Sequence, residues 1–218
     1  MVIEQEKMAV KLVSMTRGVG EMKDYSLEEL VVHSARVSNK SNQTNRETMP
    51  KLLKYLIKHK HWSPFEMVSF CIKVQTTRDI SHQIVRHRSF SFQQLSQRYT
   101  SDFDITMPEL RLQADKNRQS SSEKVVSPIL EQDVKAVINM CQEGYTRLTQ
   151  AGVARECARA LLPGCTETVL YMNGPLRSWI HYVLLRAEES TQLEHREIAL
   201  GVLKIMENIT PNLSLIHI

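Results

Sequence analysis

The chain is organised around one stretch, Arg86-His87-Arg88-Ser89-Phe90-Ser91-Phe92-Gln93-Gln94-Leu95-Ser96-Gln97-Arg98-Tyr99. It holds three arginines, one histidine, three serines and three glutamines, and it has no acidic residue. Guanidinium groups bind phosphate and carboxylate bidentately, so this composition predicts an anionic ligand. The alternative is a solvated basic surface. The interleaved apolar residues argue against a solvated surface, because they need burial and would anchor the polar groups between them. These residues are Phe90, Phe92, Leu95 and Tyr99.

The spacing of the polar residues indicates which of them point the same way. Ser96 and Arg98 are two apart, so in an extended chain their side chains share one direction. Gln83 and Arg86 are three apart and share a face if residues 79–87 form a helix. We therefore expect a helix and a following extended segment to direct these four side chains into one pocket.

The residues before this stretch predict two strands and two helices. Residues 8–15 form a short apolar stretch, and residues 68–74 alternate between apolar and polar side chains, as in a half-buried strand. A capping box at Ser26–Glu29 opens the first predicted helix. A second capping box at Thr44–Glu47 opens the other, whose apolar face is Met49, Leu52, Leu53 and Leu56.

The residues after it predict an irregular segment, four helical segments and one strand. Residues 107–127 are polar and rich in serine, which is typical of a mobile loop. Helices are expected over residues 128–152, 153–162, 175–185 and 191–208, and a strand over 166–172. With no repeat and no linker, these elements predict a single α+β domain over residues 1–218, with a small, mostly antiparallel sheet flanked by helices.

Composition limits the class of protein. The 218 residues are 42% hydrophobic and 24% charged, which is ordinary for a soluble globular domain. No apolar run is long enough to cross a bilayer, and residues 1–7 are too polar for a signal peptide. The four cysteines form no Cys-x-x-Cys motif, so we expect a reducing cytoplasm, no structural metal, and buried thiols at Cys71 and Cys157.

Several function classes lack their motifs. The sequence has no Gly-x-Ser-x-Gly elbow, no Gly-x-Gly-x-x-Gly turn and no P-loop. No cysteine lies in a basic, exposed-looking environment that would activate a thiol nucleophile. The competing class is a nucleic-acid-binding module, with arginines on phosphates and Phe90, Phe92 and Tyr99 stacking on bases. A net charge of +4 is too small for a dedicated nucleic-acid binder, and we expect that no nucleic acid binds.

Three further groups of residues carry polar side chains in an ordered pattern. His61-Trp62-Ser63-Pro64-Phe65-Glu66 precedes the strand at 68–74. Glu156 and Arg159 are three apart, a spacing usually occupied by a surface ion pair. Arg177 and His181 are four apart on one helix face, and Arg186 lies well around that helix, so the two groups serve different pockets or the pockets of different subunits.

Together these motifs resemble the flavin-dependent thymidylate synthases. The signature is Arg86-His87-Arg88, then seven residues, then Ser96, followed by Arg98. The resemblance covers residues 35–199 and includes Gln192 and Glu194. Gln94 stands where many members carry glutamate, His181 stands where some carry asparagine, and Pro175 replaces a polar flavin contact of some members.

The resemblance implies the fold of that family, a homotetramer with sites at subunit junctions, and a set of ligand contacts. The implied contacts to deoxyuridine monophosphate are Gln83, Arg86, Gln94, Leu95, Ser96, Gln97, Arg98, Arg159 and Arg186. The implied contacts to FAD are Ser38, His61, Ser63, Glu66, Arg86, His87, Arg88, Gln94, Arg177 and His181. No metal is implied.

The implied reaction methylates C5 of deoxyuridine monophosphate to give thymidylate. Methylenetetrahydrofolate gives the carbon, reduced FAD supplies hydride, and NADPH restores the flavin. Negative charge builds on the uracil ring as C5 becomes nucleophilic, so a fixed arginine beside the ring would stabilise it. Arg186 is the expected catalytic residue.

Overall fold

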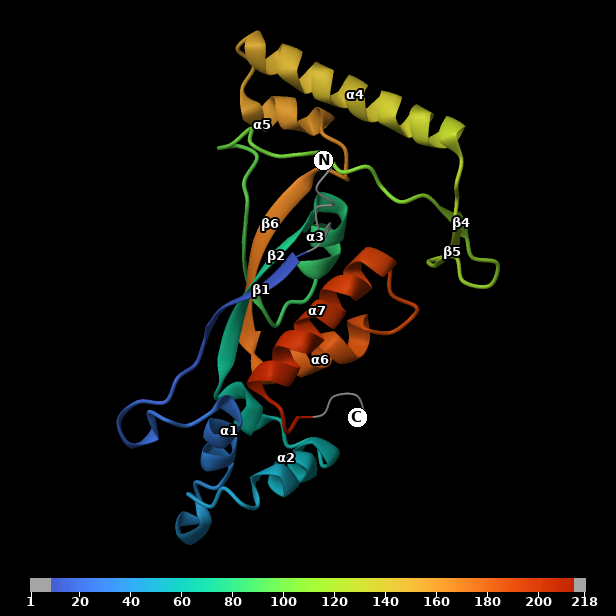
Figure 1. Cartoon of the computed structure of the whole chain (residues 1–218). Coiled ribbons are helices and arrows are strands. Elements are labelled where there is room, and N and C mark those ends of the chain that lie inside the picture. The colour runs from blue at the N-terminus through green and yellow to red at the C-terminus, as the bar shows by residue number, and fades with distance from the viewer. Residues whose placement is uncertain (1–8, 214–218) are drawn as a thin grey trace, which may run out of the picture.

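A four-stranded antiparallel sheet forms the centre of the computed structural model, which describes residues 9–213 (Figure 1). The strand order is β1-β2-β6-β3. The predicted α+β class with a small antiparallel sheet is therefore confirmed. The strands are β1 (Ala9–Met15), β2 (Ser69–Thr77), β3 (Ser91–Gln94) and β6 (Glu167–Pro175), and a separate hairpin joins β4 (Arg111–Gln113) to β5 (Ser121–Lys124). Met8, the first residue of the predicted strand, lies outside the described residues.

Helices cover one face and both ends of this sheet (Figure 1). The helices near one face are α3 (Arg78–Ile84), α6 (Leu176–Arg186) and α7 (Leu193–Ile209). At one end lie α1 (Leu27–Ala35), α2 (Met49–Lys58) and the 3-10 turn η3 (Ser63–Glu66), and at the other α4 (Pro128–Gln150), α5 (Arg155–Ala158) and η4 (Arg159–Leu161). Short 3-10 turns also occur at η1 (Gly20–Met22) and η2 (Lys40–Asn42). None of the helices over residues 9–213 is long and apolar enough to span a membrane.

The core lies on the helix-covered face of the sheet. Alternate residues of β2, namely Phe70, Ile72 and Val74, are buried, as the period-2 pattern predicts. Met172 and Leu170 of β6 stand opposite Ile72 and Val74 and are also buried. Cross-strand apolar pairs of this kind fix the register, because a one-residue slip would turn every one of them to the other face.

Phe90 anchors the polar stretch to this core. Its ring meets that of Trp179 edge-on, with the centroids 4.6 Å apart. The Trp179 indole N–H donates to the carbonyl oxygens of Phe70 (3.2 Å) and Gly174 (3.0 Å). A Cβ atom on Gly174 would lie 2.4 Å from a ring carbon of Phe90, so only glycine allows this approach. The predicted anchoring of the polar residues is thus confirmed at Phe90.

Four local predictions were wrong. Tyr99 is 79% exposed, because residues 96–99 form a turn in place of an extended chain and its side chain leaves the core. Cys157 is exposed, because the short helix α5 buries the neighbouring Ala158 in its place. The second capping box does not form: α2 begins at Met49, and Asn45 accepts from the amides of Glu47 and Thr48 instead.

The fourth is the irregular segment at 107–127, which contains the β4–β5 hairpin. Arg111 of β4 holds this hairpin against α7, since its guanidinium binds both carboxylate oxygens of Glu194 at 2.6 and 2.8 Å. Both contacts come from one guanidinium nitrogen, Nη2, and they are short because both partners are charged. The sequence could not show this contact, because the two residues are 83 positions apart.

Candidate functional site

Gln83 and Arg86 do not share a helix face as predicted. α3 ends at Ile84, so Gln83 lies in its last turn and Arg86 follows in the turn beyond it. Gln83 is half-buried and donates its amide N–H to the Gln192 side-chain oxygen at 2.7 Å. Arg86 is exposed, and so is Arg88. Neither arginine has a carboxylate partner within residues 9–213, so both are free to meet an anion.

His87 and Arg186 are half-buried and belong to a polar group that we call the histidine cluster. Arg186 donates its Nε–H to Nε2 of His87 at 3.0 Å. The His87 ring lies 5.0 Å from that of Tyr182 and 6.2 Å from that of His195, centroid to centroid. Nε2 of His195 is 3.1 Å from the Tyr182 hydroxyl. We define the histidine cluster as His87, Tyr182, Arg186 and His195.

Both histidines in this cluster are held neutral. Burial lowers the pKa of His87 from 6.5 to about 4, with the neighbouring Arg186 guanidinium adding to the effect. Burial and then the same arginine lower the pKa of His195 to about 4. Burial raises the pKa of Tyr182 well above its ordinary value, so this hydroxyl keeps its proton. The cluster therefore carries a single positive charge, on Arg186, near neutral pH.

We expect the protein to lose stability as the pH falls from 7 to 5. Between an unfolded pKa of 6.5 and a folded pKa of about 4, the unfolded chain binds protons at His87 and His195 that the folded chain does not, so stability falls as pH falls. For His195 the full effect is on the order of 3 kcal/mol, reached only below pH 4. Urea unfolding at pH 7, 6 and 5 measures it.

The matched control is His195→Asn, which no longer titrates at this position. Its loss of stability between pH 7 and pH 5 should be smaller than that of the wild type, because one of the two proton-binding sites of the unfolded chain is gone. An identical pH dependence in the two proteins would show that His195 is not held neutral by the fold.

A second group lies between β3 and α5 and contains arginines with little counter-charge. Arg98 pairs with Glu156 at 3.2 Å, with both side chains more than half exposed. Arg78 donates to the Gln97 side-chain oxygen at 2.8 Å. Burial lowers the pKa of Arg78, and the charge of Arg159 lowers it further, so two guanidinium groups lie close enough to repel each other. An anion between them would relieve that repulsion.

Neighbouring side chains complete this second group, which we call the arginine cluster: Arg78, Ser96, Gln97, Arg98 and Arg159. The backbone amide of Arg98 donates to Ser96 Oγ. Gln97 is buried, and its side-chain nitrogen has no hydrogen-bond partner within residues 9–213. A buried amide nitrogen without an acceptor is costly, which is consistent with an acceptor supplied by a ligand. Glu156 and Arg159 do not pair through their side chains; Arg159 donates to the Glu156 carbonyl oxygen.

A third group surrounds η3 and the start of α6. Arg177 forms an ion pair with Glu66, and the ring of His181 lies 5.1 Å from that of Trp62. Exposed side chains flank these pairs, namely His61 and Ser63. Ser38 is exposed just beyond the end of α1. The group therefore gathers five of the ten side chains that the resemblance assigns to flavin, from two distant parts of the sequence.

Gln94 and Leu95 have structural partners within the sheet. The Gln94 side-chain nitrogen donates to the hydroxyls of Ser81 (3.0 Å) and Thr168 (3.2 Å). The Leu95 amide donates to the carbonyl oxygen of Val169 at 2.8 Å. These bonds leave the Gln94 side-chain oxygen as its free ligand-binding atom, and that oxygen can only accept a hydrogen bond.

The single pocket expected for Gln83, Arg86, Ser96 and Arg98 stays a prediction. Across residues 9–213, no hydrogen bond or ion pair joins the histidine cluster to the arginine cluster. The group at η3 is also separate: Arg177 and Arg186 lie at opposite ends of α6, about 13 Å apart along its axis. The sequence expectation that α6 serves two pockets agrees with this spacing.

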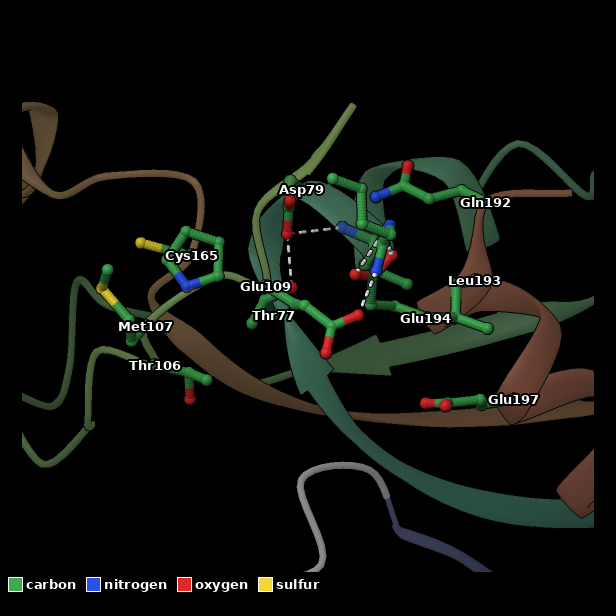
Figure 2. A pocket seen from close by; sticks show the side chains of 13 residues that line it. Thr77, Asp79, Thr106, Met107, Glu109, Cys165, Gln192, Leu193, Glu194 and Glu197 are labelled. Carbon is green, nitrogen blue, oxygen red and sulfur yellow. Dashed lines mark hydrogen bonds and ion pairs between the residues drawn. The ribbon is translucent and has the colours of Figure 1, made fainter. Parts of the chain in front are cut away.

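A pocket of about 230 Å³ lies between the start of α3 and the start of α7, as Figure 2 shows. Gln192 and Glu194, at the start of α7, line it together with Asp79 and Cys165. Most of its charged groups are already paired: Asp79 accepts from Thr77, and Glu194 binds Arg111. Among the lining residues, only Gln192 bonds to a predicted substrate contact, Gln83. The pocket is therefore lined mainly by residues that hold the fold together. No group of three potential metal ligands occurs within the described chain.

Similarity to known proteins identifies the family of this chain. The family model described as thymidylate synthase complementing protein matches residues 21–212. A flavin-dependent thymidylate synthase from Synechocystis is 41% identical over 212 residues, covering 95% of this chain and 98% of the relative. A probable flavin-dependent thymidylate synthase from Paramecium bursaria Chlorella virus 1 is 43% identical over 198 residues, covering 88% and 90%. This chain belongs to the flavin-dependent thymidylate synthase family.

The fold of this flavin-dependent thymidylate synthase family member brings three further residues into contact with the predicted site, and the sequence did not predict them. Arg78 binds Gln97, and Tyr182 and His195 join the histidine cluster. Arg78 could have been found, because it is a further arginine eight positions before Arg86. Tyr182 and His195 could not, since a tyrosine and a histidine inside amphipathic helices give no signal of mutual contact.

Proposed function

We propose that this chain converts deoxyuridine monophosphate to thymidylate, with methylenetetrahydrofolate as carbon donor, FAD as the flavin and NADPH as its reductant. The bound flavin supplies the two electrons that take the carbon from the methylene to the methyl level. The folate then gives up only its carbon and leaves as tetrahydrofolate. The family membership supports the reaction. The structural observation that supports it most is the histidine cluster, in which a hydrogen bond to His87 fixes the positive charge of Arg186.

Arg186 suits the role of stabilising the uracil ring as negative charge grows on it. Its Nε–H is bonded to neutral His87, and neither of its Nη groups has a protein partner within residues 9–213. A guanidinium held by one edge keeps its other donors fixed in direction, which is what electrostatic stabilisation of a transition state requires. Gln83 lies beside the same cluster and offers an amide to the ring.

The arginine cluster suits the substrate phosphate. Arg98, Arg159 and Ser96 offer charged and neutral donors, and the unpartnered Gln97 nitrogen offers one more. Glu156 is the carboxylate that the phosphate would displace from Arg98. Charge-assisted hydrogen bonds to a phosphate are about twice as strong as neutral ones, so several of them compensate for the loss of one exposed ion pair.

The residues around η3 and the Arg86-His87-Arg88 run suit FAD. A pyrophosphate needs cations without carboxylate partners, which Arg86 and Arg88 supply. The Glu66–Arg177 pair and the Trp62–His181 ring contact supply polar edges and a flat surface. We assign flavin contacts to Ser38, His61, Ser63 and Gln94 on the family pattern alone.

We propose a homotetramer in which different subunits complete each site. Two observations support it. No hydrogen bond or ion pair joins the histidine and arginine clusters within residues 9–213, and α4 presents apolar side chains to solvent, including Ile129 (72% exposed) and Met140 (64% exposed). An exposed apolar helix face of this kind is typical of a surface that another chain covers.

The test of the cofactor assignment is flavin binding. We expect the purified protein to bind FAD and Arg88→Ala to retain it less well, because a phosphate loses a charge-assisted bond worth about 1.5–3 kcal/mol, or roughly tenfold to a hundredfold in affinity. Fluorescence titration of the apoprotein with FAD measures it.

Arg118→Ala is the matched control, since it removes the same charge from an exposed position on the β4–β5 hairpin. It should bind FAD as the wild type does. A wild-type protein that is colourless after addition of FAD and removal of the unbound excess would contradict the proposed function.

A further inference from the structure

His195 fills a fully buried position between Tyr182 and Gln83. None of its surface is exposed. Its Nε2 lies 3.1 Å from the Tyr182 hydroxyl, and its Nδ1 lies 3.3 Å from the side-chain oxygen of Gln83. Gln83 in turn donates to the Gln192 oxygen. Tyr182, His195, Gln83 and Gln192 thus form one hydrogen-bonded chain, in which Gln83 is a predicted substrate contact.

The direction of each bond in this chain follows from its members. The Tyr182 hydroxyl is buried and protonated, and within residues 9–213 its hydrogen has no acceptor other than His195 Nε2. Leaving that hydrogen unpaired would cost free energy, so Nε2 accepts. A neutral imidazole that accepts at Nε2 carries its proton on Nδ1, which then donates to the Gln83 oxygen.

This direction determines what Gln83 can offer a ligand. Its oxygen is taken by His195, and one of its two N–H groups is taken by Gln192. The second N–H has no acceptor in the described chain. Without His195, the amide could rotate by half a turn and present its oxygen in place of its nitrogen, because the two ends have nearly the same shape.

We propose that His195 is a positioning residue, which turns the Gln83 amide so that its N–H donates to a ring carbonyl of the uracil substrate. The inference rests on the proposed function and deepens it, since it gives Gln83 the donor role and names the side chain that enforces it. The depressed pKa of His195 agrees with it, because a protonated ring could not accept from Tyr182.

Two variants of similar size separate positioning from simple packing. In His195→Asn the amide nitrogen takes the place of Nδ1 and can still donate to Gln83. In His195→Gln the amide takes the place of Nε2 and can still bond to Tyr182. Each variant keeps one of the two bonds, so a merely structural role predicts similar effects from both on thermal stability and on ligand binding.

We expect deoxyuridine monophosphate to bind His195→Gln about fivefold to tenfold more weakly than the wild type, the scale of one lost neutral hydrogen bond. His195→Asn should stay within about twofold of wild type by the same scale. Calorimetric titration of the FAD-loaded protein measures both.

A double substitution checks that the effect passes through Gln83. In the Gln83→Ala background, His195→Gln should weaken nucleotide binding no further. If either variant fails to fold, Tyr182→Phe replaces it: this change keeps the ring but frees His195 Nε2, and it should weaken nucleotide binding twofold or more, an effect absent in the Gln83→Ala background.

Equal binding by His195→Asn and His195→Gln, or an undiminished effect of His195→Gln when Gln83 is alanine, would overturn the inference while leaving the proposed function intact. A wild-type protein that does not bind deoxyuridine monophosphate would overturn the proposed function and this inference together.

Discussion

Arg186→Ala is expected to slow thymidylate formation at least ~100-fold, the scale of one lost electrostatic donor to a transition state. The ring gains negative charge as C5 becomes nucleophilic, so we expect the Arg186 guanidinium to contribute more to the transition state than to the bound substrate. The variant should still bind FAD and be reduced by NADPH. Single-turnover oxidation of the reduced enzyme, with saturating deoxyuridine monophosphate and methylenetetrahydrofolate, measures the rate.

Arg186→Lys separates charge from geometry. Lysine keeps the positive charge but has no planar fork and no Nε–H for His87, so it should recover only part of the rate. Melting temperatures of both variants control for loss of the His87 contact. Near-normal product formation by Arg186→Ala would remove this residue from the mechanism and make Arg159 the next candidate.

The second large effect is expected at the phosphate. Arg98→Ala should weaken binding of deoxyuridine monophosphate roughly tenfold to a hundredfold, because charge-assisted bonds of about 1.5–3 kcal/mol are lost. Deoxyuridine, which has no phosphate, is the control ligand, and its affinity should change little. Calorimetric titration with each ligand gives the comparison.

Glu156→Gln provides a control variant on the opposite side of the same ion pair. It removes the carboxylate that competes for Arg98, so it should not weaken phosphate binding. Equal losses of affinity for deoxyuridine monophosphate and deoxyuridine in Arg98→Ala would place Arg98 away from the phosphate.

The sequence predicted elements whose signals are local. The capping box at Ser26–Glu29 forms in both of its halves, and the alternation over residues 68–74 corresponds to the buried face of β2. The helices at 128–152, 175–185 and 191–208 were predicted to within a few residues. These signals depend on neighbours a few positions apart, so tertiary contacts do not override them.

The predictions that were wrong depend on tertiary contacts or on turn geometry. Gln83 and Arg86 lose their common face because α3 ends at Ile84, and Tyr99 is exposed because the chain turns after β3. The hairpin at 111–124 is held by a contact to Glu194 from another part of the chain. Likewise His195 lies 112 residues from Gln83, so only the fold reveals their contact.

The most direct test of the proposed reaction is the fate of the folate in one turnover. Enzyme reduced with NADPH and freed of excess reductant should convert deoxyuridine monophosphate and methylenetetrahydrofolate to thymidylate, one per flavin reoxidised, and release tetrahydrofolate. This outcome follows because both electrons of the reduction come from the flavin and none from the folate. Release of dihydrofolate in equal amount, or no thymidylate from a reduced flavoprotein, would contradict the account.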